Sequence, residues 1–399
     1  MKSETVVRAA CCAHLLGALT SLPAQAAPEQ VVRPYVGFSL THEDNVLGAG
    51  EGVAGDGAQS SNVRQISAGV LVDKRISQQA LSAALQFARN RYDRLPELDH
   101  DARDLRVNWN WHVSDHLDGN VGATDVKALA PFVNFHGRER NLRVERRTFA
   151  DGGYLLHPSW RVRAGLSRSQ LEYELESQRS LNRTEKTSEL GLDYLARSGS
   201  TVGTQLRHTS GRYPVAQVLG GVAVNNDYQQ DEVKVKVSWL ATRLTQLQFL
   251  GGPVRRTHTA FAARDYSGIN ARLQANWQAR AKLAVAAGLW REIGAIDDIT
   301  ASYTLNQGVN LGATWNATDK IKVDGLLKHE TSQYSGMIGL PAGQPDREDL
   351  VNSAVVKLQY RATDHLRLAA QAYRTRRHST EPGNSYPGNG LQMSLKYEF

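Results

Sequence analysis

Apolar and polar residues alternate along most of this chain. In the final segment one parity is apolar and the other polar, as in Leu391, Met393, Leu395, Tyr397 and Phe399 against Gln392, Ser394, Lys396 and Glu398. The same alternation recurs over residues 105–112, 232–239 and 269–278. Because successive side chains of an extended strand point to opposite sides, each segment predicts a strand with one apolar and one polar face.

Many of these segments carry an aromatic residue shortly before a polar turn. The phrases "SWLATRLTQL", "NWQARAKLAV" and "TWNATDKIKV" begin at Ser238, Asn276 and Thr314, and their tryptophans are equally spaced. A fixed period of this kind usually signals a repeated supersecondary unit. We interpret the unit as one antiparallel hairpin.

Short and long connections alternate between the predicted strands. Short turns are expected near 74–78, 113–115, 157–159, 197–199, 241–243, 279–281, 317–320 and 362–364. Long loops are expected near 43–61, 93–99, 127–137, 176–183, 212–226, 256–263, 292–299, 336–347 and 380–386. This pattern predicts an all-β chain of about 18 antiparallel strands, with about 16 as the alternative.

A soluble β-sandwich also alternates, because each of its sheets buries one face. The strand-end aromatics, the alternating connections and a final strand that ends in an aromatic residue favour a transmembrane up-and-down β-barrel instead. The aromatics predicted at the membrane interface are Trp111, Tyr194, Trp239, Trp277, Trp315 and Tyr360. Tyr397 and Phe399 resemble the signal that the barrel-assembly machinery reads in bacterial outer-membrane proteins.

The first residues predict a secretory signal peptide. Lys2 and Arg8 precede a mostly apolar run over residues 9–19, and Ala24-Gln25-Ala26 follows, so cleavage is expected after Ala26. Residues 27–399 then form the barrel, in contact with the lipid of the Gram-negative outer membrane. Cys11 and Cys12 both lie in the signal segment, which excludes disulfides and thiol chemistry from the mature chain. No later apolar run approaches the ~20 residues of a spanning helix.

A barrel of this size is expected to enclose an aqueous channel. The chain carries a formal charge of +7, and basic residues outnumber acidic ones on the predicted polar faces. The residues predicted to line the path are Arg106, Asn108, Lys234, Lys236, Arg272, Asn276, Lys322, Lys357, Arg361 and Arg367. A basic wall favours anions, so an anionic solute or an acidic polysaccharide is the expected substrate. Mixed charge that serves solubility and folding is the alternative explanation.

No motif predicts a cofactor or a metal site. The phrase "HVSDH" brings His112, Ser114 and Asp115 together in sequence, but a catalytic triad is defined by geometry, and this phrase falls on a tight turn. The remaining histidines lack metal-ligand spacing. Nucleic-acid binding is not expected, because no basic cluster is interleaved with aromatics. A channel rather than an enzyme is therefore predicted, and an outer-membrane hydrolase or deacylase is the alternative from another class.

Three segments resemble the EpsL-type outer-membrane proteins of exopolysaccharide and exosortase systems. They are "RPYVGFSLTHEDN" from Arg33, "RNRYDRLPELDHDARDLRVNWNW" from Arg89 and "LAPFVNFHGRERNLRVERRTFADGGYLLHPSWRVRAGLSR" from Leu129. The resemblance implies export of an extracellular polysaccharide, together with periplasmic export components, and it carries no catalytic residue across. A general or anion-selective porin that takes up small solutes or oligosaccharides is the second hypothesis, because both functions need the same basic lumen.

Overall fold

The computed structural model describes residues 31–50, 58–132, 137–219, 222–295, 301–336 and 346–399. The predicted signal peptide, residues 1–26, lies outside the described residues.

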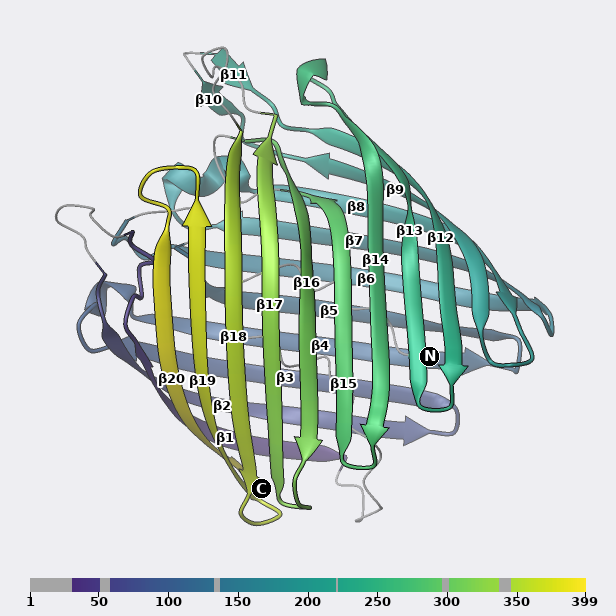
Figure 1. Cartoon of the computed structure of the whole chain (residues 1–399), viewed down its shortest axis with the longest axis horizontal. Coiled ribbons are helices and arrows are strands. Elements are labelled where there is room, and N and C mark those ends of the chain that lie inside the picture. The colour runs from purple at the N-terminus through teal and green to yellow at the C-terminus, as the bar shows by residue number, and fades with distance from the viewer. Residues whose placement is uncertain (1–30, 51–57, 133–136, 220–221, 296–300, 337–345) are drawn as a thin grey trace.

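Eighteen strands form one antiparallel sheet that closes into a barrel (Figure 1). They are β1 (Val32–Glu43), β2 (Ser61–Ile76), β3 (Gln79–Tyr92), β4 (His100–Val113), β5 (Leu117–Leu129), β6 (Leu142–His157), β7 (Trp160–Tyr173), β8 (Arg183–Leu195), β9 (Thr201–Arg212), β12 (Tyr228–Thr242), β13 (Thr245–His258), β14 (Tyr266–Arg280), β15 (Leu283–Gly294), β16 (Tyr303–Asn316), β17 (Ile321–Ser335), β18 (Arg347–Arg361), β19 (Leu366–Ser379) and β20 (Tyr386–Glu398). Strand β1 pairs with both β2 and β20, which closes the barrel. The predicted fold class and the strand count of 18 are confirmed.

The apolar faces of the strands point outward. In one row across the barrel closure, Phe38 is paired with both Ile66 and Leu395. Their side chains are 46%, 66% and 40% exposed. Rows of large apolar side chains this exposed need an apolar surrounding, because each would cost free energy in water. A lipid bilayer supplies that surrounding, and closure leaves no unpaired strand edge within it.

The two ends of the barrel differ as predicted. Short turns connect the strands at one end, which is periplasmic by the usual rule for such barrels, and the long connections gather at the other. Within the 213–227 connection the chain forms a small extra hairpin, β10 (Gln217–Leu219) and β11 (Val222–Val224), which projects from the long-loop end (Figure 1). The sequence did not predict this hairpin, because three-residue strands are too short to show an alternation.

Described parts of three long loops pack against one another. Leu47, Leu95, Leu98 and Phe132 come from three different loops and form one buried apolar cluster. Short 3₁₀ turns η1 (Pro96–Leu98), η2 (Glu176–Leu181) and η3 (Ala262–Arg264) lie in these connections. None of the helices in the described part of the chain is long and apolar enough to span a membrane.

Candidate channel wall

The strand register places every residue predicted for the path on the inward face. Residues at every second position of a strand share one face, and the exposed apolar side chains occupy the outward set of positions. The other, inward set includes Arg106, Lys234, Lys322 and Lys357. The inward set also includes Asn108, Lys236, Arg272, Asn276, Arg361 and Arg367. Whether a solute follows them remains a prediction.

The densest charge cluster of the wall centres on Asp193 of β8. Its side chain is fully buried, and its two oxygens accept hydrogen bonds from Arg163 at 2.5 and 3.0 Å and from Arg161 at 3.2 Å. Lys236 lies within electrostatic range of the same carboxylate. One buried carboxylate therefore compensates several cations from β7 and β12, and the cluster keeps an excess of positive charge.

A second cluster centres on Glu232 of β12. Lys234 lies 2.6 Å from this carboxylate, and both side chains are almost completely buried. Asn270 donates a hydrogen bond to Glu232 at 2.9 Å, and Arg207, which pairs with Glu189 at 2.6 Å, lies 3.8 Å away. Lys234 is thus part of the wall itself, so its charge reaches the lumen only weakly.

Trp290 of β15 points inward between two cations. The guanidinium of Arg272 lies 5.9 Å from the ring centroid, and the ammonium of Lys328 lies 5.7 Å from it. Arg272 also pairs with Glu292 at 2.6 Å, and the indole N–H donates to Glu330 at 3.1 Å. The ring and the carboxylates hold these cations at fixed positions on the wall.

Other predicted cations present more of their charge to the lumen. Arg106 pairs with Asp104 at 2.7 Å and is 53% exposed, and Arg367 pairs with Glu398 at 3.0 Å and is 47% exposed. Lys322 pairs with Asp324 at 3.2 Å and is 37% exposed, while Lys357 stands opposite that aspartate in the register. Arg361 donates to the backbone oxygen of Asp319 at the turn end.

Sequence reasoning missed several inward arginines. Arg161 and Arg163 alternate with the outward residues Trp160, Val162 and Ala164, so the necessary signal was present in the phrase "WRVRAG". Arg147 on β6 and Arg207 on β9 have inward parity as well. The wall of β6 to β12 is therefore more basic than predicted.

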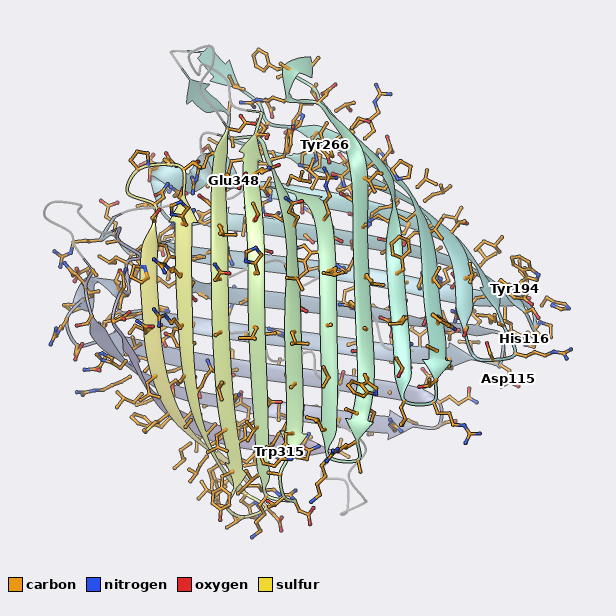
Figure 2. The ribbon with its side chains drawn as sticks, viewed as in Figure 1. Asp115, His116, Tyr194, Tyr266, Trp315 and Glu348 are labelled. Carbon is orange, nitrogen blue, oxygen red and sulfur yellow. The ribbon has the colours of Figure 1, made fainter. Side chains whose placement is uncertain are left out.

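The predicted interface aromatics lie on the outward face, one to three residues before the short turns. Trp239, Trp277 and Trp315 are 53%, 50% and 52% exposed, and Figure 2 shows Trp315 and Tyr194 at the short-turn end. Tyr360 shares this position. Their anchoring role stays a prediction.

Trp111 is less exposed than the other interface aromatics because its indole lies across glycines of neighbouring strands. A Cβ atom at Gly119 would come within 2.5 Å of the ring, and one at Gly152 within 3.5 Å. Tyr397 and Phe399 form an edge-to-face pair at 5.2 Å at the end of β20.

The "HVSDH" segment forms a tight turn and shows no triad geometry. Ser114 adopts a φ of 69°, and its hydroxyl accepts a hydrogen bond from the backbone N–H of His116 at 3.4 Å. Among the described residues, no hydrogen bond joins this hydroxyl to an imidazole, and Nδ1 of His112 is buried without a partner. Figure 2 shows Asp115 and His116 at the tip of the turn. The described part of the chain also holds no cluster of three or more potential metal ligands.

Comparison with known proteins agrees with this architecture. The family model described as "Putative beta-barrel porin 2" matches residues 215–399. The crystal structure of Pseudomonas aeruginosa OccK2 (OpdF) is similar with a TM-score of 0.50 at 10% identity, covering 92% of this chain and 98% of that one. Pseudomonas aeruginosa OccK9 (OpdG) gives a TM-score of 0.49 at 10% identity, with coverage of 92% and 98%. Acinetobacter baumannii OccAB3 gives 0.48 at 7% identity, with coverage of 92% and 99%. No curated protein matches the chain.

At these identities the structural likeness concerns the fold alone. The closed barrel, its outward apolar face and the porin family model together define the class, which is a porin-like outer-membrane β-barrel. The resemblance to the EpsL-type proteins is not among these matches, and the export role stays a prediction.

Proposed function

We propose that this protein is an outer-membrane channel that conducts small anionic solutes in preference to cations. The observation that carries the proposal is the inward-facing set of partly exposed cations, above all Arg106, Lys322 and Arg367. An 18-stranded barrel is wide enough for an aqueous path. A low-dielectric wall focuses the field of such cations into the lumen, which raises the local concentration of anions.

The paired carboxylates weaken this field without cancelling it. On the inward face of the described strands, basic side chains outnumber acidic ones, and several acids serve two cations each. Glu398, for instance, lies 3.0 Å from both Arg367 and Lys396. Conduction also benefits from contacts that are weak and repeated, and a wall of partly compensated cations provides them.

The test is the conductance of the refolded mature chain in a planar bilayer, with ion selectivity read from the reversal potential in a KCl gradient. The parent is expected to conduct with a preference for chloride. The variant Arg106→Gln/Arg367→Gln is expected to shift the reversal potential toward the value of a potassium-selective channel. It leaves Asp104 without its partner and removes one of the two cations beside Glu398.

A matched control removes the same charge from the outward surface. Arg64 and Arg168 are exposed and have outward parity, so Arg64→Gln/Arg168→Gln is expected to leave the selectivity unchanged. A parent that prefers potassium would contradict the proposal. An equal shift in both double variants would show that net charge, and not the lumen wall, sets the selectivity.

Export of an extracellular polysaccharide is the second candidate. One observation favours it: the segments that resemble the EpsL-type proteins span Arg33 to Arg168, a region outside the porin family match. A hydrated, acidic chain moving along the wall would meet the same cations and the amides of Asn108 and Asn276. Deletion of the gene separates the candidates, because export predicts loss of surface polysaccharide, whereas uptake predicts slower entry of an anionic nutrient. A folded barrel that does not conduct on its own would favour export with periplasmic partners.

A further inference from the structure

A groove on the outward face combines an apolar floor with a cationic upper edge. It has a volume of about 460 Å³ and crosses four neighbouring strands, β16 to β19. The register arranges its lining in two rows: Leu311, Leu327, Ala354 and Arg374 in the lower row, and Val309, His329, Asn352 and Arg376 in the row nearer the long loops. The groove therefore sits where the apolar band ends on the extracellular side.

Two arginines at this edge have no counterion. Arg374 and Arg376 are exposed, and in the described part of the chain neither makes a hydrogen bond or an ion pair. The neighbouring polar groups are already engaged: the His329 ring is hydrogen-bonded to Asn352 at 2.7 Å, and Asn389, opposite Arg374, binds Asp44 through both its nitrogens. An unpaired cation on the lipid face is costly at depth and tolerated near the interface, where it can meet an anion.

Two outward acids lie near the groove, and both are engaged. Asp44 accepts the hydrogen bonds of Asn389 beside Arg374. Glu348 is on the row beyond Leu350 and accepts a hydrogen bond from Gln333 at 3.3 Å, and Figure 2 shows it at the long-loop end. The charge at the groove is thus positive on balance, and it faces the headgroup region of the outer leaflet.

Below the groove the outward surface combines small and large residues. Gly325 on β17 and Ala372 on β19 lie in the next row, and a Cβ atom built at Gly325 would meet nothing within 4 Å. Val356 of β18 stands between them and is 56% exposed, so the surface is not hollow below Ala354. The apolar floor is therefore confined to the groove itself, where Leu311, Leu327 and Ala354 lie side by side.

We propose that this groove binds a phosphorylated lipid of the outer leaflet, with a headgroup phosphate on Arg374 and Arg376 and an acyl chain against the apolar floor. Two guanidinium groups on one edge suit a phosphate, because each offers a planar fork of N–H donors. The apolar floor of the groove gives the same ligand a contact that a free phosphate ion would not use. The partner is therefore a lipid and not a soluble anion.

The test measures lipid binding by the mature barrel in non-ionic detergent, using native mass spectrometry with diphosphoryl lipid A as the probe. Arg374→Gln/Arg376→Gln is expected to weaken binding about 30-fold, from about fivefold for each cation beside an anionic headgroup. The matched control is Arg168→Gln/Lys186→Gln, which removes two exposed outward cations that pair in the register outside the groove. It is expected to change binding by less than about twofold.

A second variant tests the apolar floor with all charges intact. Ala354→Phe adds an apolar side chain at an outward position of the floor, so the barrel is expected to fold, as judged by its heat-modifiable migration on a gel. It is expected to weaken binding of the probe lipid about tenfold, since the ring fills the space of the acyl contact. Equal losses in the two double charge variants, equal binding of lipid A stripped of its phosphates, or full competition by inorganic phosphate would each overturn the proposal.

Discussion

Asp193 offers the sharpest test of how the wall is held together. Its side chain has no exposed surface, and it accepts three hydrogen bonds from the guanidinium groups of Arg161 and Arg163. Asp193→Asn keeps the shape of the side chain but removes its charge and turns one acceptor into a donor. Arg161, only 9% exposed, then loses the carboxylate that it meets at 3.2 Å.

The expected cost follows from the burial of the three groups. Removing one partner of a buried ion pair typically costs about 3–5 kcal/mol, because the remaining charge stays desolvated. Arg163 is 23% exposed and can recover some hydration from the lumen, so the lower end, about 3 kcal/mol, is expected. The outward pair of Asp231 with His208 is 71% and 50% exposed, and Asp231→Asn should therefore cost less than about 1 kcal/mol.

The measurement is the free energy of unfolding from reversible urea titration in lipid vesicles, followed by tryptophan fluorescence. Asp193→Asn/Arg161→Gln should recover part of the loss, since it also removes the more buried of the two guanidinium groups that lose this carboxylate, and the double-mutant cycle isolates that coupling. A change below about 1 kcal/mol in Asp193→Asn would refute the reasoning, because it would mean that lumen water screens this site as a free surface does.

Three further predictions concern the loops, the outward face and the C-terminus. Hydrogen bonds from the Ser61 hydroxyl and from the backbone and side chain of Asn62 lower the pKa of Asp93 from its ordinary value of 3.8 to about 2. The parent should therefore be more stable than Asp93→Asn by its full margin above about pH 4, and this margin should disappear as the pH falls to about 2. The unfolding temperature in detergent measures it. Gly119→Val should destabilise the barrel by about 1–3 kcal/mol in the urea assay, because a Cβ atom there lies 2.2 Å from the backbone oxygen of Asp151 and 2.5 Å from the Trp111 ring; an unchanged barrel would mean that both the neighbouring strand and the ring shift freely. Deletion of Phe399 should slow assembly in cells while leaving refolding in detergent intact, as measured by the folded fraction on unheated gels; equal defects in both would point to lost stability alone.

The sequence alone determined the architecture of this protein because the information is local. Strict alternation sets which side of each strand is apolar, and a one-residue slip would turn every apolar side chain into the lumen. The aromatics before the short turns and the alternating connection lengths then distinguished a membrane barrel from a sandwich. The inward placement of Arg106 or Lys357 could be predicted from the alternation of apolar and polar residues alone.

Only the tertiary structure decided which charges act together. Arg161, Asp193 and Lys236 lie on β7, β8 and β12, and no spacing in the sequence indicates that they share one cluster. The exposure of each cation likewise depends on its neighbours, which is why Lys234 is buried against Glu232 while Arg106 remains open to the lumen. The outward groove at Arg374 and Arg376 has the same origin, since residues of four adjacent strands line it only when those strands are in register. The alternation of inward and outward residues is a property of one strand. Charge pairing and surface shape are properties of neighbouring strands, and these neighbours are fixed only when the barrel closes.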